Sequence, residues 1–287
     1  MKLTAKLKVS VIGSGTMGKG IVQTLAQAKC VSSIIWLGRS IEGCSSSMNE
    51  LSLHWEKMVG KKRIITEDAA DFLAKITVTE DYNEISDSSL VIEAVSENMD
   101  IKHTLFKKIF SAANRQAIIA SNTSSLSITE LSSLSPNPDQ FIGLHFFNPA
   151  PVMRLVEVVA GVATSSSTID WSLNFVRQLG KDPVVVNEAP GFIVNRMLIP
   201  MINEAIGILA EGVASAEEID KAMRFGANHP IGPLALADLI GNDVNLSIME
   251  TLHNETGDPK YRAHPLLRKM VRGKKLGRKT GSGFFDY

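Results

Sequence analysis

Two short apolar runs, Phe141–Phe147 and Met153–Val159, carry the residues best suited to acid–base chemistry. The only ionisable residue of the first run is His145, and the only acid of the second is Glu157. If the runs pair as antiparallel strands about Pro151, these two side chains lie opposite each other, because both are six positions from it. A carboxylate beside an imidazole orients a histidine base and stabilises its cation. The alternative is a structural histidine with an acid next to it, since such pairs also occur outside active sites.

A glycine-rich loop near the start of the chain predicts a dinucleotide site. A short apolar strand, Lys8–Ile12, leads directly into a GxGxxG loop, and a helix is predicted over Lys19–Lys29. This is the order that a dinucleotide fingerprint requires, because the glycines allow a tight turn and close approach of a pyrophosphate to the helix N-terminus. The loop consists of Gly13, Ser14, Gly15, Thr16, Met17 and Gly18.

The end of the second predicted strand, Ser33–Leu37, bears on which cofactor binds. An NAD-type enzyme usually presents an acid to the ribose about 20 residues after the glycines. Here the chain reads Gly38, Arg39, Ser40, with no acid between Cys30 and Ile41. An arginine and a hydroxyl can bind a 2′-phosphate, which an acid would repel. The sequence therefore favours NADP(H) over NAD(H); the alternative is that Arg39 is solvated and Glu42 takes the acid's place.

Strands and helices alternate through the first part of the chain and give way to helices alone. Further strands are predicted at Lys75–Val78, Leu90–Ala94, Ala117–Ser121 and Gly180–Glu188. This pattern predicts an α/β fold, in which residues 1–188 form a Rossmann-type doubly wound sheet and ligands bind at the carboxyl ends of its strands. Residues 189–287 are expected to form an all-α domain, with helices at Phe192–Glu211 (kinked or interrupted at Pro200), from the Ser215–Glu218 capping box to Phe225, and at Pro233–Leu252 and Pro265–Arg272.

Charge and cysteine content narrow the possible partners. Thirty basic and thirty acidic residues cancel, so no global field attracts nucleic acid or a membrane surface. No run approaches the roughly 18 apolar residues of a membrane span. Two cysteines fit a reducing, cytoplasmic location better than a disulfide framework. The six histidines are scattered without metal-ligand spacing, so no metal is expected.

Seven longer segments of the chain are VIGSGTMGKGIVQ, LVIEAVSENMDIK, ASNTSSLSITE, IGLHFFNPAPVMRLVEVV, EAPGFIVNR, GANHPIGPLALAD and LGRKTGSGFFDY. Together these segments resemble the 3-hydroxyacyl-CoA dehydrogenase family, in particular its bacterial short-chain members that act on 3-hydroxybutyryl-CoA. They extend over nearly the whole chain. The departure is at Gly38–Ser40, where the family's commoner acid is missing and the sequence resembles that of the NADP-dependent members.

The resemblance implies a role for individual residues. It implies that His145 is the general acid/base, that Glu157 orients it, and that Ser124 and Asn195 bind the substrate's 3-oxygen. It also implies that the cofactor is bound by Glu97, Lys102, Asn122 and Lys279. The implied substrates are acetoacetyl-CoA and 3-hydroxybutyryl-CoA. The implied assembly is a homodimer formed through the C-terminal domain.

The implied reaction is reversible hydride transfer, in which the histidine takes or returns the proton of the 3-hydroxyl group. Histidine suits both directions because its ordinary pKa of about 6.5 is close to working pH. A related dehydrogenase class uses a catalytic lysine in the helical domain, but Asn195 stands in the corresponding segment. The remaining alternative is a catalytically silent sensor or structural protein that binds a dinucleotide on the same fold.

Overall fold

The structure is a computed structural model and describes residues 6–287, which form two compact units. The first unit ends at Ala189, and the second extends from Pro190 to Tyr287. The boundary predicted from sequence, after Glu188, lies one residue earlier. Each unit has its own hydrophobic core. Within the described residues, none of the helices has the length and apolar character needed to cross a membrane.

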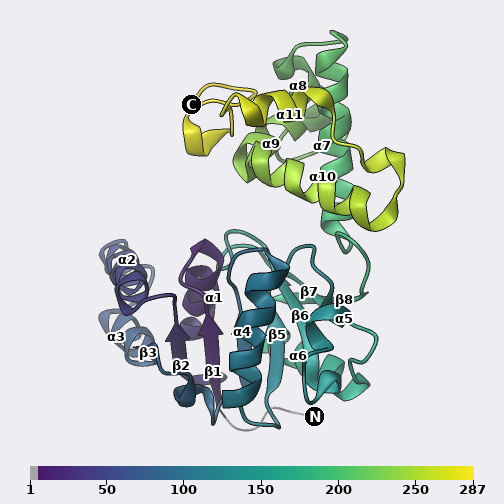
Figure 1. Ribbon diagram of the computed structural model, residues 1–287. Coiled ribbons are helices and arrows are strands. Elements are labelled where there is room, and N and C mark those ends of the chain that lie inside the picture. The colour runs from purple at the N-terminus through teal and green to yellow at the C-terminus, as the bar shows by residue number, and fades with distance from the viewer. Residues whose placement is uncertain (1–5) are drawn as a thin grey trace. The chain divides into compact units, whose positions relative to one another are not determined.

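The first unit contains an eight-stranded sheet with strand order β3-β2-β1-β4-β5-β6-β7-β8 (Figure 1). Every neighbouring pair is parallel except β6 and β7, which are antiparallel. This arrangement confirms the predicted doubly wound α/β fold. The strands are β1 (Leu7–Ile12), β2 (Val31–Leu37), β3 (Ile76–Thr79), β4 (Leu90–Glu93), β5 (Ile118–Ser121), β6 (Phe141–Phe146), β7 (Leu155–Ala160) and β8 (Asp182–Asn187).

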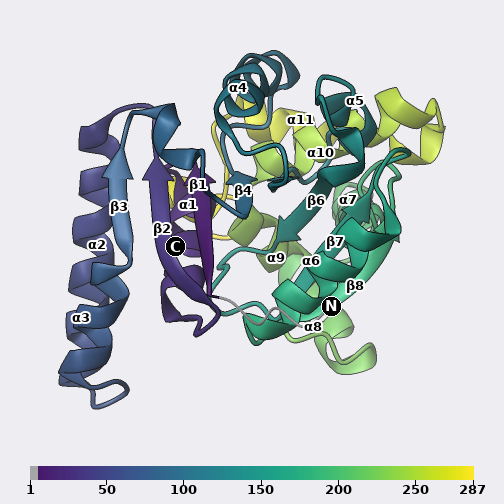
Figure 2. The ribbon, with the colours of Figure 1, turned by 90° about the horizontal axis from the view of Figure 1, so that it is seen from below.

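Helices cover both faces of this sheet because its strands are apolar on both faces. One core cluster joins alternate strand residues such as Val9 and Trp36 to side chains of the helices before and after them. On the other face, Phe106 packs edge-on against Phe141, with ring centroids 5.1 Å apart. Figure 2 shows two of the helices beside β3 at one edge of the sheet, α2 and α3. The helices of this unit are α1 (Thr16–Gln27), α2 (Ile41–Gly60), α3 (Thr66–Ala74), α4 (Met99–Ala112), α5 (Ile128–Ser132) and α6 (Ser166–Gln178).

Most predicted boundaries in the first unit differ from the structure by one to three residues, and two of these differences have a clear local cause. Helix α1 begins at Thr16, not at Lys19, because Gly15 is already its N-cap residue. Strand β7 begins at Leu155, not at Met153, because the amide of Met153 closes a turn by bonding to the carbonyl of Pro149 at 3.0 Å.

The second unit is helical, as predicted, and the structure decides two details of its helices. Of the two outcomes predicted at Pro200, an interruption is wrong, because Pro200 lies inside α7, where Ile199, Ile202 and Ile206 bury one face of the helix in the core; a kink there stays a prediction. The single helix predicted over Pro233–Leu252 is two helices, because Gly241 has φ +108°, a conformation that breaks a helix. The helices are α7 (Val194–Ala210), α8 (Ala216–Gly226), α9 (Pro233–Ile240), α10 (Asn242–Thr256) and α11 (Pro265–Arg272).

Candidate active site

A buried histidine–glutamate pair lies near the carboxyl end of β6. His145 is directly opposite Glu157 in the β6–β7 ladder, which confirms the register predicted from their spacing about Pro151. Nδ1 of His145 is 2.7 Å from Oε2 of Glu157. The two residues are only 5% and 1% exposed. A buried carboxylate at this distance fixes the orientation of the imidazole and stabilises its protonated form.

The turn that connects β6 to β7 is fixed from outside the strands. The buried Lys181, which precedes β8, donates from Nζ to the carbonyls of Ala150 at 2.6 Å and Met153 at 2.7 Å. Burial lowers the pKa of this lysine, and the two carbonyls satisfy its ammonium group. The ring of Phe147 packs 4.4 Å from the His145 ring. These contacts hold the pair on a rigid support.

The loop after β5 is joined to β6 by a buried asparagine. Oδ1 of Asn122 accepts a hydrogen bond from the amide of Phe146 at 2.9 Å, directly after His145. Oε1 of Glu97 accepts hydrogen bonds from the amide of Ser124 at 2.7 Å and from the hydroxyl of Thr123 at 2.5 Å. The structure therefore brings Asn122, Ser124 and Glu97 together at the carboxyl edge of the sheet.

Lys102 makes a buried ion pair at the same edge. Its Nζ is 2.5 Å from Oε1 of Glu93 and 3.4 Å from Oε2 of Glu97. Lys102 is 1% exposed and Glu93 is fully buried. The same glutamate also accepts hydrogen bonds from the hydroxyl of Ser121 and the amide of Val95. Lys102 therefore neutralises a buried carboxylate beneath the edge, and its cofactor contact stays a prediction.

The glycine loop after β1 has the shape needed for a pyrophosphate. Gly13 has φ +130°, and a Cβ there would collide with the carbonyl of Ala94. A Cβ on Gly18 would collide with the carbonyl of Gly13, whereas one on Gly15 would meet nothing within 4 Å. Gly15 is also the N-cap of α1, and no side chain caps this helix end. The open approach at Gly15 and the uncapped helix dipole fit a phosphate group.

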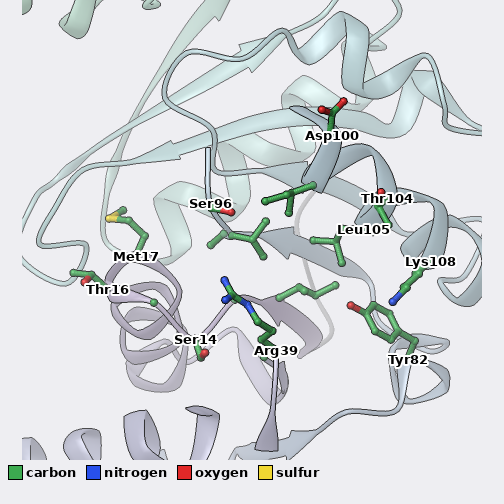
Figure 3. Close-up of a pocket in the computed structure, with 17 residues that line it drawn as sticks. Ser14, Thr16, Met17, Arg39, Tyr82, Ser96, Asp100, Thr104, Leu105 and Lys108 are labelled. Carbon is green, nitrogen blue, oxygen red and sulfur yellow. The ribbon is translucent and has the colours of Figure 1, made fainter. Parts of the chain in front are cut away.

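A cavity of about 1030 Å³ opens above this loop (Figure 3). Arg39 extends from the end of β2, and its guanidinium points into this cavity. Of the predicted cofactor residues, those that line it are Gly13, Ser14, Gly15, Thr16, Met17, Gly38 and Arg39. Gly18, Ser40, Glu97, Lys102 and Asn122 do not line it.

The far wall of the cavity was not predicted from the sequence. It includes Tyr82, which follows β3, and a stripe of α4 residues at helical spacing. Burial raises the pKa of the Tyr82 phenol, and the Lys108 ammonium lies 5.8 Å from the centre of its ring. The four-residue spacing of these positions could have shown from the sequence that they share one face of the helix. No cavity-facing side was predicted for this helix. The stripe consists of Asp100, Ile101, Thr104, Leu105 and Lys108.

The remaining predicted residues have structural contacts of their own. Oγ of Ser40 caps α2 by accepting a hydrogen bond from the amide of Gly43 at 3.2 Å. In the second unit, Asn195 is buried in the first turn of α7, and Lys279 pairs with Asp243 at 2.5 Å. The roles of Asn195 and Lys279 at the active site stay predictions. Among the described residues, no cluster of His, Cys, Asp and Glu could hold a metal ion.

Comparison with known proteins agrees with this arrangement. Residues 8–189 match the family described as 3-hydroxyacyl-CoA dehydrogenase, NAD binding domain, and residues 191–287 match its C-terminal domain. A 3-hydroxybutyryl-CoA dehydrogenase of Clostridioides difficile is 51% identical over 281 residues, which cover 98% of this chain and 99% of that protein. The mitochondrial hydroxyacyl-coenzyme A dehydrogenase of Homo sapiens is 39% identical over 286 residues, 97% of this chain and 90% of that protein.

A solved structure shows the same fold over nearly the whole chain. The crystal structure of (S)-3-hydroxybutyryl-CoA dehydrogenase from Ralstonia eutropha has a TM-score of 0.94, with 44% identity and 99% of each chain covered. Both matched domains and the identity to the curated relatives therefore place this chain, with its buried His145–Glu157 pair and its glycine loop, in the 3-hydroxyacyl-CoA dehydrogenase family of NAD-dependent oxidoreductases.

Proposed function

We propose that this protein catalyses reversible hydride transfer between (S)-3-hydroxybutyryl-CoA or acetoacetyl-CoA and a nicotinamide dinucleotide. The observation that carries the proposal is the buried contact of 2.7 Å between His145 and Glu157 near the carboxyl end of β6. The relatives from Clostridioides difficile and Ralstonia eutropha are named 3-hydroxybutyryl-CoA dehydrogenases, and we base the proposal of a four-carbon substrate on these names. The catalytically silent alternative offers no reason for this buried pair.

The reacting proton is handled by the buried pair. Glu157 holds Nδ1, so Nε2 is the ring nitrogen that exchanges a proton with the substrate's 3-oxygen. In oxidation His145 accepts the hydroxyl proton, and in reduction the imidazolium returns it to the forming alkoxide. Ser124 and Asn195 are proposed to bind this oxygen as it changes between hydroxyl and carbonyl. The bound nicotinamide dinucleotide supplies or accepts the hydride.

The fit of the dinucleotide rests on the glycine loop and the cavity above it. The open backbone at Gly15 and the uncapped N-terminus of α1 would hold the pyrophosphate. The side of the cavity at Gly38 and Arg39 would hold the adenosine ribose. NADP(H) is proposed as the preferred cofactor because Arg39 points into the cavity (Figure 3) and Gly38, Arg39 and Ser40 stand where an acid is usual.

Assembly and location complete the proposal. The second unit exposes several large apolar side chains, and burying them against a second copy would form a homodimer. The most exposed are Met197, Val213 and Phe225, at 72%, 70% and 74%. Both cysteines, Cys30 and Cys44, are free thiols, which fits a reducing cytoplasm.

The decisive experiment measures reduction of acetoacetyl-CoA by NADPH and by NADH, compared as kcat/KM. His145→Gln is expected to lower kcat by at least about 10²–10⁴-fold while cofactor binding is kept. His103→Gln is the control, because His103 lies on α4 near Glu130 and outside the proposed site. Near-normal turnover by His145→Gln would overturn the mechanism.

The cofactor assignment has its own measurement in the same assay. Arg39→Ala is expected to reduce kcat/KM for NADPH much more than for NADH, because only NADPH carries the 2′-phosphate. If the wild-type enzyme prefers NADH, the proposed reaction stands but the NADP(H) assignment is wrong. Absence of turnover with either cofactor would favour the silent binding protein.

A further inference from the structure

A carboxylate lies at the end of β2 even though the sequence has no acid between Cys30 and Ile41. Oε1 of Glu80 accepts a hydrogen bond from the amide of Ile41 at 2.7 Å. Ile41 is the first residue of α2, and Gly38 and Arg39, three and two positions before it, line the cavity. Glu80 therefore brings a negative charge to the loop that the resemblance assigns to the adenosine ribose.

The neighbouring strand β3 delivers this charge. Strands β2 and β3 are parallel, and Leu37 at the end of β2 pairs with Thr79 at the end of β3. Because parallel strands end at one edge of the sheet, Glu80 emerges beside Gly38. The sequence between Cys30 and Ile41 does not supply an acid to this edge of the sheet. Glu80, which follows the adjacent strand β3, supplies one instead.

The surroundings keep the Glu80 carboxylate in this place. The hydrogen bond from the amide of Ile41 holds the Glu80 side chain at the N-terminus of α2, the end of a helix at which a negative charge is favourably placed. The effect of this charge extends to the next turn: burial raises the pKa of the Cys44 thiol, and the Glu80 charge raises it further. A Cβ on Gly38 would collide with Sγ of Cys44, so this thiol lies directly against the loop.

We propose that Glu80 is a cofactor-selecting residue that disfavours the 2′-phosphate of NADP(H) and thereby limits the preference created by Arg39. The inference rests on the proposed function in one respect, that residues 38–40 receive the adenosine ribose. Arg39 and Lys108 supply positive charge to the cavity wall and Asp100 supplies negative charge; Glu80 adds a second negative charge from outside the wall, at the N-terminus of α2. The balance of these charges sets the ratio of affinities for the two cofactors.

Glu80→Gln separates the charge of this residue from its hydrogen bond. The amide oxygen of glutamine can still accept from Ile41, so the helix end keeps its partner while the negative charge is removed. Glu80→Ala removes both. Glu84→Gln is the matched control, because Glu84 is also exposed and follows β3 but belongs to the next turn, Tyr82–Ile85.

The experiment measures dissociation constants of NADP⁺ and NAD⁺ for the intact protein by calorimetry, without acyl-CoA. Glu80→Gln is expected to tighten NADP⁺ binding by about three- to tenfold, the effect of removing one exposed charge, and to change NAD⁺ binding less than about twofold. Raising the salt concentration should reduce this change in NADP⁺ affinity, because the charges of Glu80 and of the 2′-phosphate are both exposed to solvent. Glu84→Gln should leave the ratio of the two constants unchanged.

Failure of this inference and failure of the proposed function can be told apart. If Arg39→Ala weakens NADP⁺ binding but Glu80→Gln leaves the ratio of the two constants unchanged, the selecting role of Glu80 is overturned and the ribose site stands. If neither variant changes the ratio, the ribose does not bind at residues 38–40 and both statements fall. Because no acyl-CoA is present, a wrong substrate assignment does not affect this result.

Discussion

Nδ1 of His145 lies 2.7 Å from Oε2 of Glu157, and the two residues face each other across antiparallel strands. Both are buried in a sheet whose remaining neighbouring strands are parallel. A contact at this position can hold the imidazole in one orientation, since both side chains are buried and in contact with each other. In the proposed mechanism this contact sets the orientation of the His145 ring, so loss of the contact should have a measurable effect on catalysis.

Replacing Glu157 with glutamine should damage catalysis more than binding. The amide can support the wrong tautomer of His145 and cannot stabilise the imidazolium, so kcat for acetoacetyl-CoA reduction is expected to fall by about 10²–10⁴-fold. The dissociation constant of the cofactor should change little. Steady-state kinetics and a cofactor titration measure the two quantities, and Glu130→Gln, at an exposed position of α5, is the control. A variant with wild-type kcat would show that the pair is structural.

Alanine at two glycines of the loop should separate binding from folding. A Cβ on Gly15 meets no protein atom within 4 Å and φ there is −71°, so Gly15→Ala should keep its melting temperature while cofactor affinity drops by at least about tenfold. A Cβ on Gly18 collides with the carbonyl of Gly13, so Gly18→Ala should lower stability by about 1–3 kcal/mol. Thermal denaturation and cofactor titration test both. Equal loss of stability in the two variants would contradict this reading of the loop.

Lys102 should matter to folding because it neutralises Glu93. Lys102→Met leaves a buried carboxylate without its cation, which costs about 3–5 kcal/mol of unfolding free energy. The double variant Glu93→Gln/Lys102→Met should recover a large part of this loss because no uncompensated charge remains. Urea unfolding of the wild type and both variants gives the comparison. If Lys102→Met keeps wild-type stability and loses only cofactor affinity, the lysine is a ligand and not a structural partner.

Asp220 should make the stability of the second unit depend on pH. Burial raises the pKa of its carboxyl, the amides of Leu234 and Ala235 lower it in part, and the nearby Asp238 raises it. The pKa in the folded state is then above the unfolded value of about 3.9. The folded state binds the proton more tightly, so this contribution to stability is complete below the unfolded pKa and is lost as the pH rises through the folded pKa.

Asp220→Asn removes this titration and isolates its effect. The difference in unfolding free energy between wild type and variant should fall as the pH rises from about 4 through the raised pKa. At neutral pH the variant should also lose about 1 kcal/mol, because Asp220 accepts two amides, at 2.8 and 2.9 Å, and asparagine has one acceptor oxygen. Urea unfolding at a series of pH values measures the difference. Parallel stability curves for the two proteins would contradict the raised pKa.

The sequence by itself determined the features that depend on neighbours along the chain. Strand, glycine loop and helix in succession identified the dinucleotide fold, because backbone approach and the helix N-terminus are local properties. The equal distances of His145 and Glu157 from Pro151 gave their register, because a hairpin relates residues by simple counting. The alternation of strands with helices, followed by helices alone, gave the two-part architecture.

The tertiary structure decided everything that depends on which strands are neighbours. Glu80 is 39 residues from Ile41 and reaches it only because β3 lies beside β2. Lys102 meets Glu93 beneath the sheet edge, although the sequence suggested a cofactor ligand. Which residues form the far wall of the cavity depends on the orientation of α4. The break between two helices at Gly241 depends on a backbone conformation that composition does not reveal. Such contacts join distant parts of the chain, so their energies are realised only after the sheet has formed.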